Sequence, residues 1–194
     1  MYKISEGCLY NYLLENNIPG LKDKVRYITL KKGQFLYGPR QGKTDIYEII
    51  TGAVQLGNIS AKEEEYIYEI LAPGEFFGNL AMLGDSFSEF CKAMCATQIR
   101  VYDLDFFKHI MTHDPIVAEW CFGKIVFRWN KTETLLAYIR SLEPRERIQY
   151  VYADLSKLIM TAGNRETVLS KLLTYKNIAD LTATTRQLVA DTIK

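Results

Sequence analysis

The sequence predicts an α+β protein in which an antiparallel β-roll is followed by a long helix and a small all-α domain. Short β-rich runs punctuated by glycines fill the chain from Val25 to Asp105, a texture typical of an antiparallel jelly roll. A continuous helical stretch over 115–142 stops before Pro144, because proline cannot continue a helix. Two short helices around a tight turn are expected within 173–194. The chain therefore divides into a roll, a connecting helix and a helical domain.

The composition fits a folded protein with one medium and one small domain. The chain has 194 residues, of which 48% are hydrophobic and 24% are charged, and its net charge is only +1. The net charge of the whole chain does not indicate nucleic-acid binding, so any affinity for DNA must come from cationic residues clustered at one place. The four cysteines are scattered, no signal peptide precedes them, and no apolar run is long enough to cross a bilayer. We expect buried free thiols, a cytoplasmic protein and no membrane partner.

The roll is expected over residues 1–114 and begins with a lid. Residues 1–20 are predicted to form a short amphipathic helix that ends at Pro19 and Gly20. The strands expected after it are Val25–Leu30, Phe35–Tyr37, Ile46–Ile50, Ala53–Leu56, Tyr66–Leu71 and Thr97–Leu104. The acidic run Glu63–Glu65 lies between two of these strands and is most simply a solvated hairpin tip.

The helix over 115–142 is apolar nearly all round in its first half. Its apolar residues there are Ile116, Val117, Trp120, Cys121, Phe122, Ile125, Val126, Phe127 and Trp129. A surface helix of a monomer needs only one apolar stripe. We therefore expect this helix to bury one face against the roll and another against a second molecule, which predicts a homodimer.

The segment 143–194 is predicted to be a small all-α domain. A helix over Glu143–Met160 is followed by a polar stretch and then by two short helices. The first is capped by Thr174 and the second by Thr184 or Thr185, because a threonine hydroxyl accepts from free amides of a first turn. Their buried faces consist of Ile178, Ala179, Leu181, Leu188, Val189 and Ile193. This pattern is typical of a helix-turn-helix that reads DNA with its second helix, although an ordinary helical hairpin gives the same pattern.

The order of these parts resembles the cyclic-AMP receptor protein and FNR (CRP/FNR) family of bacterial transcription regulators. The resemblance covers essentially the whole chain and is carried by Lys32-Gly33, the turn at Gly42, Tyr47, Thr51-Gly52, Pro73-Gly74-Glu75-Phe76-Phe77-Gly78, Glu146-Arg147-Ile148 and Leu173 to Lys194. It implies that the roll is similar to a cyclic-nucleotide-binding domain. It also implies that the long helix relays the state of the ligand to the DNA-reading domain.

The resemblance places a ligand site in the roll, but with altered chemistry. The implied ligand-binding residues are Gly78, Asn79, Leu80, Ala81, Glu89, Phe90, Cys91 and Thr132. In nucleotide-binding members a Glu contacts the ribose and an Arg the phosphate, and Asn79 and Glu89 stand in those two positions here. Residues 60–90 also carry one lysine against seven carboxylates, so an anionic nucleotide meets a repulsive field.

We therefore expect no useful binding of cyclic AMP or cyclic GMP and predict no cofactor. The pocket is expected to hold an unidentified neutral or cationic effector, or to be filled by Phe87 and Phe90.

The resemblance also indicates the residues that would contact double-stranded DNA. They are Thr174, Tyr175, Lys176, Thr185, Arg186, Gln187, Ala190, Asp191 and Lys194. Arg186 is retained from the family pattern, Gln187 is able to pair with adenine, and Asp191 inverts the charge of the last family position. Because the sequence stops at Lys194, the expectation is a helix-turn-helix without the family's β-wing.

Enzyme classes find little support in the sequence. His109 and His113 are the only histidines, and Asp114-Pro115 interrupts their helix, so we predict no metal site. A cupin-type metal centre or a nucleophile–base dyad would need a histidine in the roll strands, and residues 1–108 contain none. Two interpretations follow: a dimeric DNA-binding regulator, or a sensing or interaction module of the same fold whose DNA binding is weakened or lost.

Overall fold

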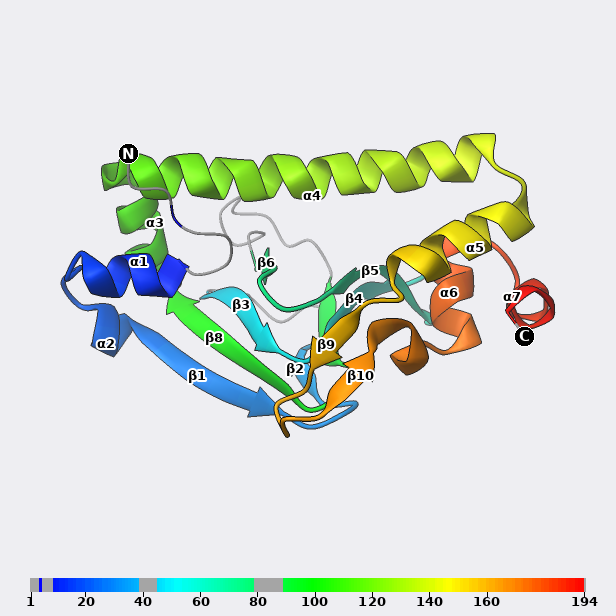
Figure 1. The fold of residues 1–194 in the computed structure, drawn as a ribbon, viewed down its shortest axis with the longest axis horizontal. Helices are drawn as coiled ribbons and strands as arrows, with labels where there is room; N and C mark the ends of the chain where they lie inside the picture. Colours follow the sequence, from blue (N-terminus) through cyan, green and yellow to red (C-terminus); the bar gives the residue numbers. More distant parts are fainter. Residues whose placement is uncertain (1–3, 5–8, 39–44, 79–88, 194) are drawn as a thin grey trace.

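The computed structural model describes residues 4, 9–38, 45–78 and 89–193, and it has the predicted α+β fold. A long helix, α4 (Pro115–Ser141), lies along one side of a β-roll (Figure 1). The helices α5 (Pro144–Asp154), α6 (Tyr175–Thr182) and α7 (Arg186–Thr192) lie near the end of the molecule where α4 stops. The roll, the long helix and the helical C-terminal part are therefore confirmed.

The roll consists, in the part of the chain described, of two four-stranded sheets with antiparallel neighbours. Their strand orders are β1-β8-β3-β6 and β2-β7-β4-β5. The bounds are β1 (Val25–Leu30), β2 (Phe35–Tyr37), β3 (Asp45–Thr51), β4 (Val54–Ile59), β5 (Glu65–Leu71), β6 (Phe76–Phe77), β7 (Phe90–Ala93) and β8 (Thr97–Asp103). All six predicted strands are present, and the acidic run lies at the β4–β5 turn as predicted. Strands β6 and β7 were not predicted.

The core of the roll lies between the two sheets. Alternate residues of each strand point inward, because successive side chains of a strand face opposite sides. The buried residues of this inner cluster are Leu30, Tyr37, Tyr47, Ile49, Val54, Leu56, Leu71, Phe77, Cys91, Ala93, Ile99 and Val101. Each large apolar side chain buried in this way contributes about 1.5–3 kcal/mol.

The N-terminal helix covers one end of the roll, as predicted. Leu9 and Leu13 of α1 (Leu9–Glu15) are fully buried. They belong to a cluster with Phe107 and Ile110 of α3 (Leu104–His113) and with Val117 at the start of α4. The short helix α2 (Leu21–Lys24) adds Leu21 to the same cluster and leads into β1.

Helix α4 begins at the predicted residue because Asp114 caps it. The Asp114 Oδ1 atom accepts hydrogen bonds from the amides of Ile116 (2.9 Å) and Val117 (3.3 Å), and Pro115 needs no donor at the first helical position. Val117 is fully buried, whereas Phe122 is 68% exposed. One face of α4 is therefore turned to the roll and another to solvent. No helix of the described residues is both long and apolar enough to cross a membrane.

The C-terminal domain is not all-α, and the predicted helix over Glu143–Met160 is wrong beyond Asp154. A two-stranded sheet, β9 (Leu158–Met160) and β10 (Glu166–Val168), follows α5, and a 3-10 turn, η2 (Leu169–Leu172), precedes α6. The residues of β9 alternate between exposed, buried and exposed, which is a strand period. The spacing of Leu155, Leu158 and Ile159 also fits a helix, so the short apolar run was ambiguous.

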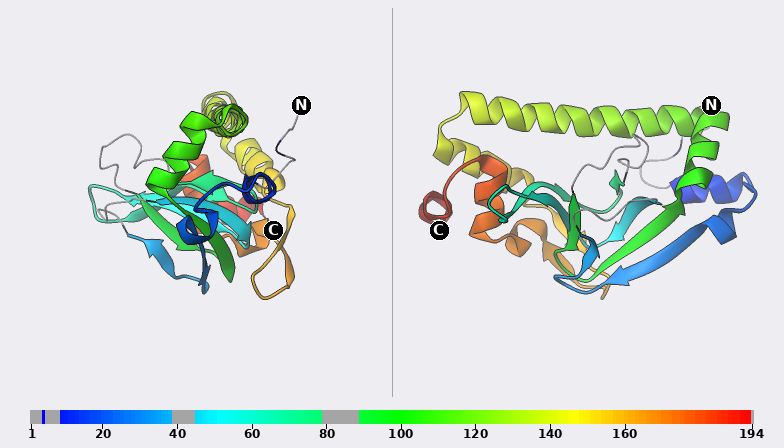
Figure 2. Two further views of the ribbon diagram at one scale, coloured as in Figure 1. Left: turned by 90° about the vertical axis from the view of Figure 1, so that its left-hand side faces the viewer. Right: turned by 180° about the vertical axis from the view of Figure 1, so that it is seen from behind.

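The C-terminal domain shares a core with the roll. Val151, Leu155, Ile159, Leu169 and Leu181 pack in one cluster with roll residues that include Ile67, Ile70 and Phe90. The β9–β10 sheet is also joined to the roll by backbone hydrogen bonds from the amide of Gly52 to the Met160 carbonyl (2.7 Å) and from the amide of Ala162 to the Ala96 carbonyl (2.9 Å). Figure 2 shows from behind that α6 lies beside the strands of the roll.

Two glycines provide opposite tests of this packing. A Cβ atom on Gly57 would lie 2.2 Å from the Tyr66 carbonyl oxygen and 2.4 Å from the Phe90 ring. We expect Gly57→Ala to lower the free energy of unfolding by about 1–3 kcal/mol, because backbone must move. Gly123 on exposed α4 has no atom within 4 Å of that position, and we expect Gly123→Ala to raise stability by about 0.5–1 kcal/mol. Urea denaturation measures both, and equal effects would contradict the account.

Candidate functional site

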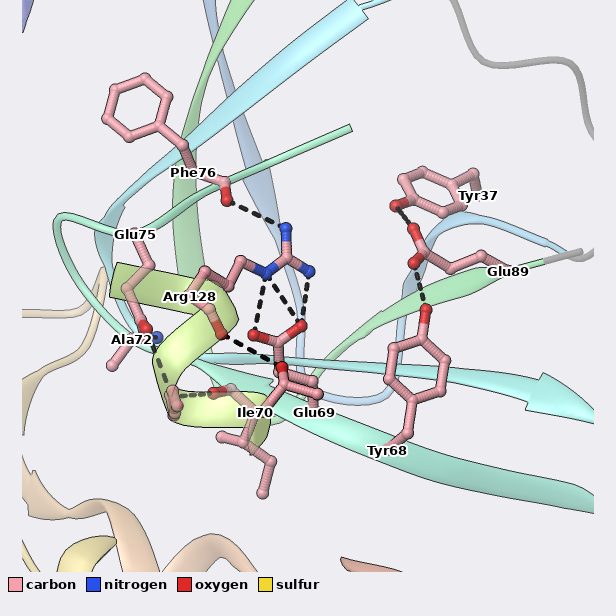
Figure 3. A network of polar contacts seen from close by, with 11 residues as sticks. Tyr37, Tyr68, Glu69, Ile70, Ala72, Glu75, Phe76, Glu89 and Arg128 are labelled. Atoms are coloured by element: carbon pink, nitrogen blue, oxygen red, sulfur yellow. Dashed lines mark hydrogen bonds and ion pairs between the residues drawn. The ribbon is translucent and has the colours of Figure 1, made fainter. Parts of the chain in front are cut away.

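The interior of the roll contains a buried carboxylate, Glu89, held by two tyrosines. Its Oε1 atom accepts a hydrogen bond from the Tyr37 hydroxyl at 2.5 Å, and its Oε2 atom accepts one from the Tyr68 hydroxyl (Figure 3). Burial, followed by the adjacent Glu89 carboxylate, raises the pKa of Tyr37 and of Tyr68 far above the ordinary tyrosine range. Both hydroxyls therefore stay protonated and donate to the carboxylate.

Strand alternation explains why Glu89 points inward. Glu89 and Cys91 are two residues apart, and Cys91 is fully buried in the inner cluster. Phe90 between them lies on the other side of β7, where its ring packs edge-on against Phe35 at 5.8 Å and joins the cluster shared with the C-terminal domain. The expectation that Phe90 fills the pocket is therefore corrected, and Phe87 lies outside the described residues.

Aromatic rings from three strands fill the interior beside Glu89. The Tyr37 ring lies 5.8 Å from that of Tyr47 and 6.4 Å from that of Phe77, and the Tyr47 and Phe77 rings stack at 5.1 Å. Gly78 follows Phe77 with φ at +94°, and a Cβ there would lie 2.5 Å from the Asp45 carbonyl oxygen. Only glycine fits this position without strain. The predicted ligand residues Asn79, Leu80 and Ala81 lie outside the described part of the chain.

The face of α4 turned to the roll carries cations that are paired with strand β5 and the turn after it. The Arg128 guanidinium binds the Glu69 carboxylate through Nε, at 2.9 and 3.0 Å, and through Nη2 (Figure 3). The Lys131 ammonium lies 3.3 Å from the Glu75 carboxylate and donates to the Ile70 carbonyl at 3.4 Å. These contacts compensate the charges locally, so they hold α4 on the roll.

A cavity of about 950 Å³ lies between α4, the roll and α5. Its lining is largely apolar and includes Trp120, Trp129, Leu135 and Tyr150, with Glu89 at the roll side. The predicted ligand residue Thr132 also lines it, although its hydroxyl donates to the Arg128 carbonyl of its own helix at 3.1 Å. The charged side chains of the lining are the carboxylates of Glu69, Glu89 and Asp154 and the cations Lys124, Arg128 and Lys131, so they have no net charge. The buried Glu89 carboxylate would repel an anion placed beside it.

The two terminal helices have the predicted caps and core. The hydroxyls of Thr174 and Thr185 accept from the amides of Asn177 and Leu188 at 3.1 and 3.2 Å. Ala183 ends α6 in the left-handed conformation, with φ at +49°, which makes the turn between the helices tight. Ile178, Ala179 and Val189 are buried together with Ile148 of α5.

Six of the nine residues predicted to contact DNA gather on one surface. A hollow of about 620 Å³ is lined by Thr174, Tyr175, Lys176, Arg186, Gln187 and Ala190. Asp191 is exposed one turn further along α7, where it accepts a hydrogen bond from the Gln187 amide at 3.1 Å. Lys194 lies outside the described residues. The start of α6 and the outer face of α7 therefore form one continuous surface.

Sequence reasoning missed several residues of these sites. Tyr37 and Tyr68 come from separate strands, and no local pattern connects them to Glu89. Asp180, which pairs with Lys176 at 2.7 Å, was detectable because the two residues are four apart on one helix. Arg128 and Lys131 were detectable as cations in the helix predicted to pack on the roll, because such cations need partners when they are half-buried.

The histidine pair lies on the surface. The rings of His109 and His113 are 4.2 Å apart at the end of α3. In the described ranges, no group of three or more His, Cys, Asp or Glu side chains is arranged to hold a metal ion.

Comparison with known proteins identifies the roll and the whole fold. Residues 27–114 match the family model of the cyclic nucleotide-binding domain. FixK2 from Bradyrhizobium japonicum is 16% identical, with a TM-score of 0.71 over 87% of this chain and 82% of that one. TTHB099, a CRP-family transcriptional regulator from Thermus thermophilus, is 18% identical, with a TM-score of 0.67 over 86% and 82%. The c-di-GMP-responsive global regulator CLP from Xanthomonas campestris is 14% identical, with a TM-score of 0.69 over 92% and 89%. No curated protein sequence matches the chain.

A tyrosine pair on β5 tests the role of Glu89. We expect Tyr68→Phe to lower the free energy of unfolding by about 1.5–3 kcal/mol, because it removes a donor from a buried carboxylate. Tyr66→Phe, two residues away on the same strand at a side chain 40% exposed, is the matched control and should change little. Chemical denaturation of the two variants distinguishes them, and equal losses would rule out a special contact at Tyr68.

Proposed function

We propose that this chain, which resembles the CRP/FNR regulators in its whole fold and matches the cyclic nucleotide-binding domain over residues 27–114, is a homodimeric, sequence-specific DNA-binding transcription regulator. The observation that carries the proposal is the common surface of α6 and α7, on which the start of one helix and the outer face of the other meet. Two solved proteins of similar fold are described as a transcriptional regulator and as a global regulator linked to gene expression.

Helix α7 is suited to enter the DNA major groove. Its first two residues, Arg186 and Gln187, are exposed, and its buried side is anchored by Val189. An arginine donates two hydrogen bonds to guanine, and a glutamine pairs in the same way with adenine. Asp191 has the wrong charge for a phosphate contact, and its hydrogen bond with Gln187 competes with base readout. The interaction-module alternative draws its support from this pair.

An exposed apolar stripe along one flank of α4 supports a homodimer, although part of the same stripe also lines the cavity beside the roll. Ala118, Phe122, Ile125, Trp129, Thr132 and Leu136 are spaced alternately by four and three residues along one stripe. This is the heptad spacing of a two-stranded coiled coil. Four of the stripe's apolar side chains are about half to two thirds exposed, namely Phe122 (68%), Ile125 (49%), Trp129 (63%) and Leu136 (54%). Such a continuous apolar stripe is best covered by the same stripe of a second copy.

The roll is proposed not to respond to a cyclic nucleotide. Glu89 stands where the nucleotide-binding members of the family carry an arginine, and it is buried with its oxygens held by Tyr37 and Tyr68. A cyclic phosphate brought next to this carboxylate would be repelled in a medium of low dielectric constant. The effector, where one exists, is therefore neutral or cationic.

The dimer is tested by two phenylalanines of α4 with similar exposure. Phe122 lies on the stripe and is 68% exposed, whereas Phe127 lies off it and is 65% exposed. We expect Phe122→Asp to dissociate the dimer, because it places like charges at the seam, and Phe127→Asp to leave the dimer intact. Sedimentation equilibrium measures the mass of each variant, and a monomeric wild-type protein would remove the proposal.

DNA binding is tested with Arg186. We expect the wild-type protein to bind fragments from its own upstream region with an affinity that falls steeply with salt, and Arg186→Ala to lose about 1–3 kcal/mol with relaxed specificity. Arg165→Ala, in the β9–β10 turn, is the matched loss of an exposed arginine and should have little effect. If gel-shift titration at low salt finds no bound fragment, with or without cell extract, the interaction-module alternative replaces this function.

A further inference from the structure

The first helix of the terminal pair is docked on the free edge of strand β5. We propose that Lys176 and Asp180 of α6 form a latch that fixes the DNA-reading helices to the roll. The latch itself follows from the geometry of the described residues, and its consequence for DNA rests on the proposed function.

In the latch, the cationic side chain binds a backbone carbonyl of β5 and the anionic side chain binds a backbone amide of the same strand. The Lys176 ammonium donates to the Glu65 carbonyl at 2.6 Å, and the Asp180 carboxylate accepts from the Ile67 amide at 3.2 Å. The two side chains also pair with each other at 2.7 Å. In an extended strand the carbonyl of one residue and the amide two residues later point to the same side. Within the part of the chain that the structure describes, β5 is the outer strand of its sheet, and a lysine and an aspartate four apart on a helix bind its outer backbone groups.

Further contacts surround the latch. Leu181 of α6 is buried in the cluster that contains Ile67 and Ile70 of β5. The Asn177 amide donates to the Gln55 side chain at 3.3 Å on the neighbouring strand β4. The α6–β5 contact thus combines buried apolar side chains at its centre with hydrogen bonds at its edge, as a small protein interface does.

Docking of α6 leaves the reading surface of α7 accessible. Arg186 and Gln187 are exposed, and both line the hollow shared with the start of α6. The latch therefore presents α7 in a fixed direction from the roll and does not conceal it. Because the Lys176 ammonium is directed at the strand, its role in the latch replaces the phosphate contact expected from the sequence.

Amide exchange tests the latch without DNA. We expect the Ile67 amide to exchange on the order of tenfold faster in Asp180→Asn than in the wild-type dimer, because a hydrogen bond to a charged group is lost. Asp191→Asn is the matched control on α7, because the Asp191 carboxylate also accepts from a side chain four residues away. This variant should leave the exchange rate of the Ile67 amide unchanged. An Ile67 amide that exchanges as slowly in Asp180→Asn as in the wild type would overturn the proposal.

A charge swap separates the latch from a simple salt bridge within α6. The double variant Lys176→Asp with Asp180→Lys keeps the attraction between the two positions and places the negative charge nearer the helix N-terminus, which favours the helix. It also directs a carboxylate at the Glu65 carbonyl and an ammonium at the Ile67 amide. We expect exchange at Ile67 as fast as in Asp180→Asn with unchanged helix content by circular dichroism. Slow exchange in the swapped protein would show that only the intrahelical pair matters.

DNA titration in different salt concentrations tests the role of Lys176. If the latch holds, Lys176→Met weakens operator binding several-fold with the salt slope unchanged, because no phosphate contact is lost. A slope reduced by about one, together with unchanged exchange at Ile67, would assign Lys176 to the phosphate backbone and overturn the latch. Failure of all DNA binding would remove the proposed function but leave the exchange result to decide on the latch.

Discussion

The ion pair between Arg128 of α4 and Glu69 of β5 is the contact from which the arrangement of the molecule follows. A half-buried guanidinium is tolerated only with a partner, and Glu69 provides one with two-point geometry. The pair lies on the face of α4 that meets the roll, together with the apolar contacts of Val117 and Trp120. The same strand offers its outer backbone edge to α6, so β5 links the roll to the long helix and to the terminal helices.

The interior of the roll holds a buried carboxylate that is hydrogen-bonded by groups of the chain itself. The residues that match the cyclic nucleotide-binding domain enclose a carboxylate, Glu89, whose negative charge is stabilised by hydroxyl donors from Tyr37 and Tyr68. The hydroxyl donors of Tyr37 and Tyr68 are thus occupied by a group of the chain itself. Its stabilisation depends on burial, because a hydrogen bond to a charge is stronger away from water.

Features that depend on neighbouring residues, such as helix caps, were predicted from the sequence more often than contacts between residues far apart in it. The caps at Thr174 and Thr185 were predictable because a cap involves only the next three residues. The run Leu158–Met160 was not, since three apolar residues fit a helix or a strand, and its packing against the roll decides between them. The contacts of Glu89 join residues far apart in sequence. The sequence therefore predicted a negative charge that repels an anionic ligand, but not the two tyrosines that bind the carboxylate.

The most direct test of the central claim, that the roll carries a carboxylate where nucleotide-binding members of the family carry the phosphate-binding arginine, is calorimetric titration of the purified protein with cyclic AMP and cyclic GMP. We predict no saturable heat with either nucleotide, because the buried Glu89 carboxylate would repel the cyclic phosphate. Saturable binding at micromolar concentration or tighter, with one nucleotide displacing the other, would contradict the account.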